Sequence, residues 1–266
     1  MDAAQRLLCR LWSFEPVLRD FLLSERISAS IQGFFVTDFP LWKFAYLLDE
    51  TWIEEDIMNA LAELAYFVHA ISSQDDVPMS LYLPTNFISD ARRLYHQHPR
   101  VYSPELLALR NRLTSTRVEC IAFLECTNYH YSAFILNRSQ LALLKHSDSL
   151  GHLASDDILP ILRWILSGTN YPLPIHIHEI DAPRQAASGT GSGSCGIAAH
   201  DFVLRHLAVD SSSNLCPQWT SLESPRFRDD ALLDLVEYHY LVSKTAIVSF
   251  SASTYLGLKL ITDRKI

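Results

Sequence analysis

The sequence has 266 residues, of which 48% are hydrophobic, and it carries a formal net charge of −8 at pH 7. A chain of this length and composition can bury a substantial core, so we expect one large domain, or one domain with extensions, rather than disorder. The negative charge argues against nucleic acid as a partner, because binding to phosphate relies on Lys and Arg.

Cysteine usage and the N-terminal residues indicate the compartment. The five cysteines are an odd number and form no Cys-x-x-Cys pair, so a reducing environment is the simpler inference. The opening MDAAQRLLCRLWSFEP has arginines within its apolar stretch and lacks the small-residue cleavage site of a signal peptide. No apolar run approaches the roughly 20 residues of a membrane-spanning helix. We therefore expect an intracellular protein of the cytoplasm or nucleus that has no membrane partner.

The N-terminal quarter of the chain predicts helices. Residues 1–45 are rich in leucine and aromatic residues and are interrupted at Pro16 and Pro40, which favours two short helices packed on a larger body. The run Thr51-Trp52-Ile53-Glu54 fits a capping box and predicts a helix that begins there and continues to about Ala70.

Strands are predicted in the middle of the chain. Residues 81–86 indicate a short extended segment, and Ser103-Pro104 is typical of a helix start. The apolar runs 120–124 and 130–136 predict a pair of buried strands, followed by a further strand over 140–144.

The second half of the chain alternates between helices and strands. Ser155-Asp156-Asp157 predicts a helix start, and the alternating residues 175–180 predict a strand. A helix is expected after Cys195 and another over 229–242, whereas residues 245–261 are β-rich.

Cys195 lies between a glycine-rich run, residues 188–193, and the apolar stretch 197–207. A thiol at a helix N-terminus meets unpaired backbone N–H groups and the positive end of the helix dipole, which favour the nucleophilic thiolate. A lone cysteine is more often a small buried residue. The hypothesis of a nucleophile therefore depends on a base and an orienting acid.

His130 and Asp148 are the candidates for base and acid. His130 stands at the start of a predicted strand, directly after the turn residues 127–129, and Asp148 follows eighteen positions later. Taken separately, a structural histidine and a turn aspartate explain them as well. Their joint arrangement with Cys195 is what favours a Cys-His-Asp triad.

Several stretches, in chain order, carry a resemblance to a known family. They are Trp52 to Asn59, Cys120 to Leu136, Lys145 to Leu150, Arg184-Gln185 and Ser194-Cys195-Gly196. This set resembles the Ulp (ubiquitin-like-protein protease) family, which includes the SUMO-specific proteases and their deneddylating relatives, and it covers roughly residues 45 to 210.

The resemblance implies an α+β papain-like cysteine protease fold of the Ulp/adenain type, with a central mixed or antiparallel sheet flanked by helices and the nucleophile at a helix N-terminus. It divides the chain into a helical N-terminal extension (1–45), a catalytic domain (46–210) and a C-terminal extension with a helix and β-rich residues (211–266).

The same resemblance implies the roles of single residues. Cys195 would be the nucleophile, His130 the general base and then acid, and Asp148 the carboxylate that orients the imidazole. Gln185 would contribute its side-chain amide to the oxyanion hole. The implied reaction is thiol-mediated hydrolysis after a C-terminal Gly-Gly, without a metal or a cofactor.

Substrate binding is expected at Trp52, Glu55 and Tyr131, with the two aromatic rings over a channel that admits only glycines. The implied partner is SUMO, ubiquitin, NEDD8 or a related ubiquitin-like modifier. The sequence departs from the family's pattern at Tyr131, where a tryptophan is usual, at Ser194 and Glu55, which replace aspartates, and in the long interval between Gln185 and Cys195.

Other readings of these residues remain open. Residues 191–196 match Gly-x-Gly-x-x-Gly, but a loop-like segment separates them from the preceding strand, unlike a dinucleotide site. His176, His178 and Glu179 suit a metal site, and a solvated strand face explains them equally well. A Yop-type acetyltransferase or a catalytically weak domain that binds a ubiquitin-like protein would retain the same residues around Cys195.

Overall fold

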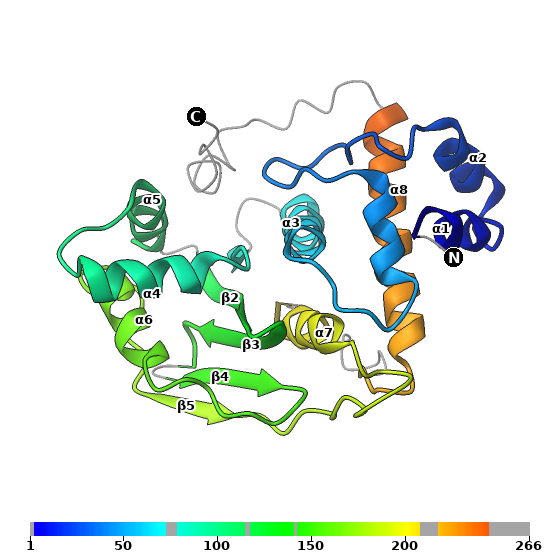
Figure 1. Ribbon diagram of the computed structural model, residues 1–266. Coiled ribbons are helices and arrows are strands. Elements are labelled where there is room, and N and C mark those ends of the chain that lie inside the picture. Colours follow the sequence, from blue (N-terminus) through cyan, green and yellow to red (C-terminus); the bar gives the residue numbers. More distant parts are fainter. Residues whose placement is uncertain (1–2, 73–78, 115–117, 141–142, 208–217, 245–266) are drawn as a thin grey trace.

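The computed structural model describes residues 3–72, 79–114, 118–140, 143–207 and 218–244 (Figure 1). Its elements are α1 (Ala3–Leu11), α2 (Pro16–Ser24), the 3-10 helix η1 (Leu41–Leu47), α3 (Glu55–Ser72), β1 (Met79–Tyr82), α4 (Phe87–Gln97), α5 (Pro104–Leu113), β2 (Val118–Thr127), β3 (His130–Asn137), β4 (Leu143–Asp148), α6 (Ile158–Leu166), β5 (His176–Glu179), α7 (Cys195–Leu207) and α8 (Ser224–Lys244).

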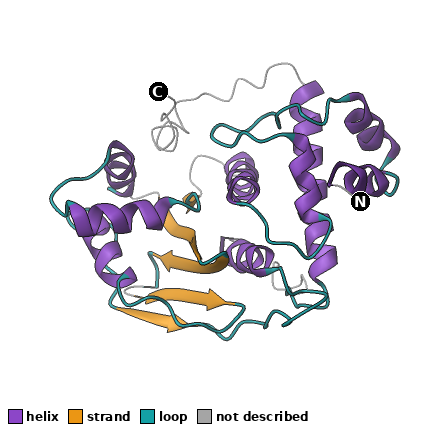
Figure 2. Cartoon of the chain, in the orientation of Figure 1, coloured by secondary structure: helices purple, strands orange, loops and turns teal. Residues whose placement is uncertain are grey.

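The strands form one five-stranded sheet in the order β1-β2-β3-β4-β5. β2, β3 and β4 are antiparallel neighbours, whereas the edge strands β1 and β5 run parallel to β2 and β4. Helices flank this sheet (Figure 2), and α7 begins at Cys195. The expected α+β fold, a mixed sheet flanked by helices with Cys195 at a helix N-terminus, is confirmed.

The inner strand β2 is buried on both faces, which explains its continuous apolar sequence. Ala122 and Leu124 pack into a core formed with α3, α7, α8 and the N-terminal helices. Ile121 and Phe123 pack into a second core, built with α4, α5 and α6. Because alternate residues of a strand point to opposite faces, β2 joins both cores to one sheet.

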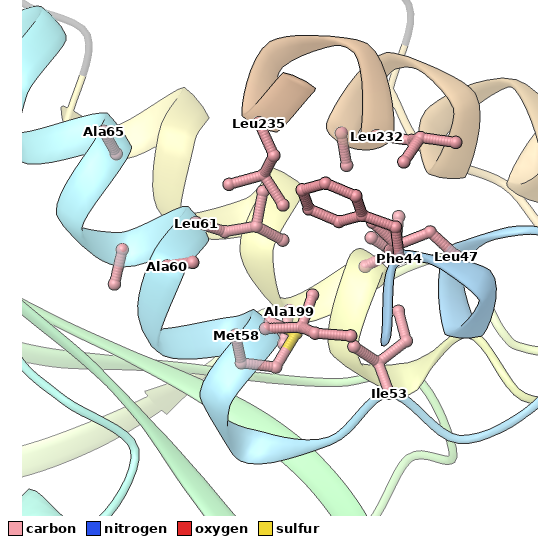
Figure 3. Close-up of a cluster of buried hydrophobic side chains, with 14 of the residues drawn as sticks. Phe44, Leu47, Ile53, Met58, Ala60, Leu61, Ala65, Ala199, Leu232 and Leu235 are labelled. Atoms are coloured by element: carbon pink, nitrogen blue, oxygen red, sulfur yellow. The ribbon is translucent and has the colours of Figure 1, made fainter. Parts of the chain in front are cut away.

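The C-terminal helix α8 belongs to the first core. Figure 3 shows Phe44 of η1 against Leu61 of α3 and Leu232 and Leu235 of α8, all of them buried. α8 lies between α3 and the pair of N-terminal helices α1 and α2 (Figure 1). The predicted helix over 229–242 is therefore confirmed, and it is longer than expected, since it begins at Ser224 and continues to Lys244.

The division of the chain at residues 45 and 210 stays a prediction, and the expected β-rich stretch 245–261 lies outside the described residues. The two predicted N-terminal helices are present as α1 and α2. No described helix combines the length and the apolar character that crossing a lipid bilayer requires.

A tight turn connects β2 and β3. Asn128 and Tyr129 have φ of 52° and 60°, and Thr127 pairs with His130 across the hairpin. Two successive residues with positive φ are typical of a type I′ turn, whose twist matches that of the flanking strands. The sequence predicted a longer connection from residue 125, but β2 continues through its polar end. The turn fixes His130 as the first residue of β3.

β4 begins later and ends later than the sequence predicts. The expected strand over 140–144 is observed over Leu143–Asp148. Gln140 belongs to the preceding turn, whereas His146 and Ser147 are buried although they are polar. A prediction based on apolar runs missed the second half of this strand because its residues are polar. Its last residue, Asp148, pairs with Ser132 of β3.

The predicted start of α3 is wrong by about one turn. Thr51 was expected to cap the helix, but its hydroxyl donates to Asp49 Oδ1 over 2.8 Å. The first intrahelical bond runs from the N–H of Met58 to the carbonyl of Glu54, so the helix begins at Glu55. Trp52 consequently stands in an extended segment ahead of the helix. By contrast, the expected cap Ser103 accepts from the N–H of Leu106 and is confirmed.

Candidate active site

His130 and Asp148 meet at the end of the sheet where β3 begins and β4 ends. Since Asp148 lies opposite Ser132, it is a diagonal neighbour of His130 on the same face of the hairpin. Nε2 of His130 donates to Oδ2 of Asp148 over 2.9 Å. The His130 side chain is 14% exposed and that of Asp148 is 4% exposed. This bond orients the ring and leaves Nδ1 available for a further partner.

The Asp148 carboxylate is held by the turn that follows it. Its Oδ1 accepts from the backbone N–H groups of Leu150, Gly151 and His152 over 2.7, 2.9 and 3.3 Å. Burial by itself raises the pKa of Asp148, but the hydrogen bonds from His130 and from this turn outweigh burial and lower the pKa below its usual value. Asp148 is therefore ionised near neutral pH.

Cys195 is the first residue of α7 and is buried. The following residue, Gly196, packs closely on α3 and β3, because a Cβ there would lie 2.9 Å from Sδ of Met58 and 3.3 Å from Cδ2 of Tyr131. A side chain at this position would crowd both residues, so glycine favours the close approach of α7. The glycine thus brings the N-terminus of α7 to the beginning of the strand that carries His130.

The electrostatics of His130 show that Cys195 lies beside the ring. Burial alone lowers the pKa of His130, but the hydrogen bond to Asp148 and the neighbouring Cys195 thiol outweigh burial and raise the pKa to about 9. The protonated ring is therefore favoured between an anionic carboxylate and the sulfur. The structure brings together the three residues that the sequence proposed for a triad.

Gln185 lies next to Asp148 along a neighbouring segment. Its backbone N–H donates to the carbonyl of Ser149 over 2.9 Å, and the Ser149 hydroxyl donates to Oε1 of Gln185 over 3.2 Å. Arg184 donates to the carbonyl of Asp148 over 3.1 Å. Within the described residues no hydrogen bond joins Gln185 to Cys195. Gln185 is therefore held beside Asp148, and its side-chain amide nitrogen takes part in none of the bonds named here.

Aromatic side chains border the site. Trp52 stacks on Tyr131 with ring centroids 5.5 Å apart, and Tyr129 meets Trp52 edge-on at 5.5 Å. Tyr131 is 1% exposed and donates to the carbonyl of Ile53 over 3.2 Å. The structure therefore places Tyr131 beneath Trp52 and leaves Trp52 and Tyr129 as the outer rings. Sequence reasoning missed Tyr129, although its position in the hairpin turn is a usable signal of exposure.

Glu55 is exposed at the start of α3, where Thr85 donates to Oε2 over 3.4 Å. Its charge reaches the interior of the site. Burial, and to a smaller extent the neighbouring charges of Glu55 and Cys195, raise the pKa of Cys126 to about 11. Glu55 thus gives the region around Trp52 and Cys195 a negative rim.

The glycine-rich segment before Cys195 serves packing between chain segments. Gly193 lies so close to the backbone of Glu50 that a side chain would collide with it. Ser194 donates to Oε2 of Glu50 over 2.8 Å, and the buried Arg228 donates to the carbonyls of Gly193 and Thr51 over 2.7 and 2.8 Å. These contacts account for Gly193 without a bound dinucleotide. Sequence reasoning missed Arg228, which offers no local signal.

The three candidate metal ligands on β5 have different surroundings. His176 and His178 are exposed. Glu179 accepts from Nδ1 of the buried His146 over 2.5 Å and from the N–H of Ala154 over 3.2 Å. Among the described residues, the one group of three side chains with closely spaced metal-binding atoms is elsewhere and contains His130, Asp148 and His152.

Comparison with known proteins finds likeness in structure alone. No protein-family model matches the sequence, and no curated protein matches it. SUMO protease Ulp1 with its catalytic cysteine oxidised to a sulfinic acid matches at a TM-score of 0.59 and 15% identity, over 85% of this chain and 97% of that chain.

Two further structures give the same picture. The C-terminal Ulp1 protease domain in complex with Smt3, the yeast ortholog of SUMO, has a TM-score of 0.58 and 15% identity over 85% of this chain and 97% of that chain. The Ulp1-like SUMO protease catalytic domain of Chaetomium thermophilum has a TM-score of 0.56 and 16% identity over 84% and 89%. The chain thus has the fold of Ulp1-type SUMO protease catalytic domains.

Proposed function

We propose that this protein is a cysteine protease that cleaves the peptide or isopeptide bond after the C-terminal Gly-Gly of a ubiquitin-like modifier, with SUMO as the first candidate. The observation that carries the proposal is the 2.9 Å bond between His130 and Asp148, made on the same ring that lies beside Cys195 at the start of α7. The shared fold with SUMO proteases supports this reading.

In the first step, the proton of the Cys195 thiol resides on His130, in keeping with the raised pKa of the ring, and the thiolate attacks the carbonyl carbon of the scissile bond. Negative charge develops on the carbonyl oxygen. The backbone N–H of Cys195 is one of the N–H groups that a helix leaves without an intrahelical acceptor, so it is suited to receive that charge. We assign the amide of Gln185 to the same oxyanion.

In the second step, the imidazolium of His130 protonates the departing amine, and the C–N bond breaks to leave a thioester on Cys195. Water, deprotonated by the same imidazole, then attacks the thioester and releases the carboxylate and the thiol. Asp148 stays ionised throughout and stabilises the imidazolium, because its Oδ1 is fixed by the turn while its Oδ2 faces the ring.

The substrate tail is assigned to the aromatic border of the site. An extended Gly-Gly segment passes along the face of Trp52 that Tyr131 does not cover, where a Cβ would collide with a flat aromatic surface. Tyr129, which is 79% exposed, flanks the entrance, and Glu55 favours a basic residue upstream of the glycines.

A panel of modifiers tests the proposal. SUMO, ubiquitin and NEDD8, each with an electrophile in place of the terminal carboxylate, are incubated with the protein, and covalent adducts are scored by mass. We expect an adduct with SUMO. Cys195→Ala should form none, and Cys9→Ala, which changes an exposed cysteine on α1, should react like wild type. A folded wild-type sample that reacts with no modifier would contradict the proposal and favour a binding domain or an acetyltransferase.

A further inference from the structure

His152 adds a second imidazole to the Asp148 carboxylate. Its Nδ1 lies 3.9 Å from Oδ2 of Asp148, and Nε2 of His130 lies 2.9 Å from the same oxygen. The rings of His130 and His152 meet edge-on at 5.5 Å, and the three donor atoms all lie within 4.8 Å of one another. The His152 side chain takes no part in the proposed cleavage.

The local backbone directs Oδ2 to both rings. Three N–H groups of the following turn occupy Oδ1 of Asp148, among them that of His152 itself. Arg184 holds the turn from outside, since it donates to the carbonyl of Asp148 and covers Gly151. The carboxylate therefore cannot rotate without losing these bonds, and Oδ2 is held in place beside both rings before any ligand arrives.

This geometry suits a tetrahedral metal ion. Ligand atoms of tetrahedral zinc lie about 3.3 Å apart when each is about 2.0–2.1 Å from the ion. The separations of 2.9 and 3.9 Å from Oδ2 to the two ring nitrogens lie on either side of that spacing. Two imidazoles and one carboxylate are donors that zinc and similar borderline ions accept, whereas Mg²⁺ prefers oxygen ligands alone. The His152 side chain is 66% exposed, so an ion can reach the group from solvent.

We propose that His130, Asp148 and His152 form an inhibitory site for a borderline divalent transition-metal ion such as Zn²⁺, with water as the fourth ligand. The ion takes the place of the proton between His130 Nε2 and Asp148 Oδ2, and that proton leaves to solvent. The imidazole then loses the hydrogen bond that orients it for Cys195. The inhibitory consequence rests on the proposed function, whereas metal binding itself does not.

Zinc affinity of the full chain tests the site directly. The protein is stripped with a chelator, and its binding of Zn²⁺ alone is measured by competition with a chromophoric chelator and by calorimetry. We expect one Zn²⁺ per chain and no competition by Mg²⁺. Loss of a partner that merely supports a metal ligand weakens binding about 10–100-fold, so His152→Ala should weaken it at least tenfold.

Three variants complete the test. His98→Ala, which removes an exposed histidine elsewhere, should leave zinc affinity unchanged. His152→Asp keeps a ligand and should bind more tightly than His152→Ala. Cys195→Ala should bind like wild type, because the thiol is on the other side of the ring. Absent or non-saturable binding, wild-type affinity in a folded His152→Ala protein, or loss of binding in Cys195→Ala would each overturn the proposed site.

The inhibitory effect is measured separately, as the zinc concentration that halves the rate of adduct formation with the modifier probe. We expect His152→Ala to require at least tenfold more zinc than wild type. Zinc bound at the site without slowing the adduct would overturn inhibition while leaving the metal site standing. A protein that forms no adduct but still binds zinc through His152 would separate failure of the proposed function from failure of the site.

Discussion

The protonation of His130 depends chiefly on one carboxylate. Burial lowers the pKa of this ring, and the hydrogen bond to Asp148 is the largest influence that raises it, to about 9. Asp148→Asn should therefore lower the pKa of His130 toward or below the ordinary value of about 6.5. An NMR titration of the ring protons measures the change directly. An unchanged midpoint near 9 in the variant would show that Asp148 does not control the ring.

The same substitution should slow catalysis. Replacing the orienting carboxylate by an amide in a serine protease lowers kcat about 10⁴-fold, and we expect a loss of about 10²–10⁴ in the rate of modifier cleavage here. The rate is measured on a modifier fused to a fluorogenic leaving group, with folding checked by circular dichroism. A folded Asp148→Asn protein of wild-type activity would remove Asp148 from the triad.

Stability should follow pH through this pair. Because the folded-state pKa of His130 is raised, the pair's contribution is fully present below about pH 6.5 and is lost as the pH rises through about 9. The difference in free energy of unfolding between wild type and Asp148→Asn should therefore shrink between these pH values. Urea titrations at pH 6.5 and pH 9.5 measure it, and a difference that grows with pH would contradict the assignment.

Gln185 offers a further test at the residue scale. Removal of one oxyanion donor typically costs about 10²–10³ in kcat, so Gln185→Ala should lose that much if its amide reaches the reacting carbonyl. Ser149→Ala, which removes a hydroxyl bonded to the same side chain, is the matched control and should lose far less. Equal activities of Gln185→Ala and wild type would leave the backbone N–H of Cys195 as the donor.

The sequence was most informative where chemistry and local pattern coincide. Cys195 and His130 follow recognisable boundaries, a glycine-rich run and a turn, so their places at the starts of α7 and β3 could be predicted. Arg228 could not be, because its partners are brought near by tertiary packing rather than by spacing. His152 lies only four residues after Asp148, but its approach to His130 depends on the pairing of β3 with β4. The burial of Tyr131 was also hidden, since an aromatic residue suits both a lid and a core.

At the scale of elements, the β2–β3 turn carries a direct stability prediction. Asn128 adopts φ of 52°, a conformation that asparagine tolerates and β-branched residues resist. Asn128→Val should destabilise the protein by about 1–2 kcal/mol, whereas Asn128→Gly should be close to neutral. Urea denaturation measures both. Equal stability of the valine variant would mean that the turn adapts and does not fix the start of β3.

The boundaries of helices and strands were predicted less accurately than their presence. α3 and β4 were both expected, yet the cap of α3 and the second half of β4 were misplaced. The sequence around Thr51 fits a capping box, but tertiary contacts prevent it from forming. Glu50 accepts a hydrogen bond from Ser194, and the Thr51 carbonyl accepts one from Arg228. In β4, the buried polar residues His146 and Ser147 pair with neighbours that the local sequence does not reveal.

At the scale of the whole molecule, Arg228 ties the C-terminal helix to the start of α7. It is 1% exposed and donates to the carbonyls of Tyr46, Thr51 and Gly193. Loss of one partner from a buried charged network typically costs about 3–5 kcal/mol, so Arg228→Met should destabilise the protein by that amount. Its free energy of unfolding in urea provides the measurement.

A matched variant on the same helix controls for the loss of charge. Arg226 is half exposed and pairs with Glu223 and Asp230 at the surface, so Arg226→Met should cost less than about 1 kcal/mol. If both variants lost the same small amount, Arg228 would be dispensable. The core that joins α8 to α3 would then hold the C-terminal helix without it.

The close approach of α7 at Gly196 affects which compounds can react with Cys195. Met58 and Tyr131 lie close to the first turn of α7, so we expect the spacing between the Cys195 sulfur and the His130 imidazole to be set by the resting fold rather than by an arriving substrate tail. If the proposed triad is assembled in advance, compounds that imitate no part of a modifier can react with it. We therefore expect small thiol-reactive molecules to label Cys195 in the free protein, and a screen for ligands can begin from fragments rather than from peptides.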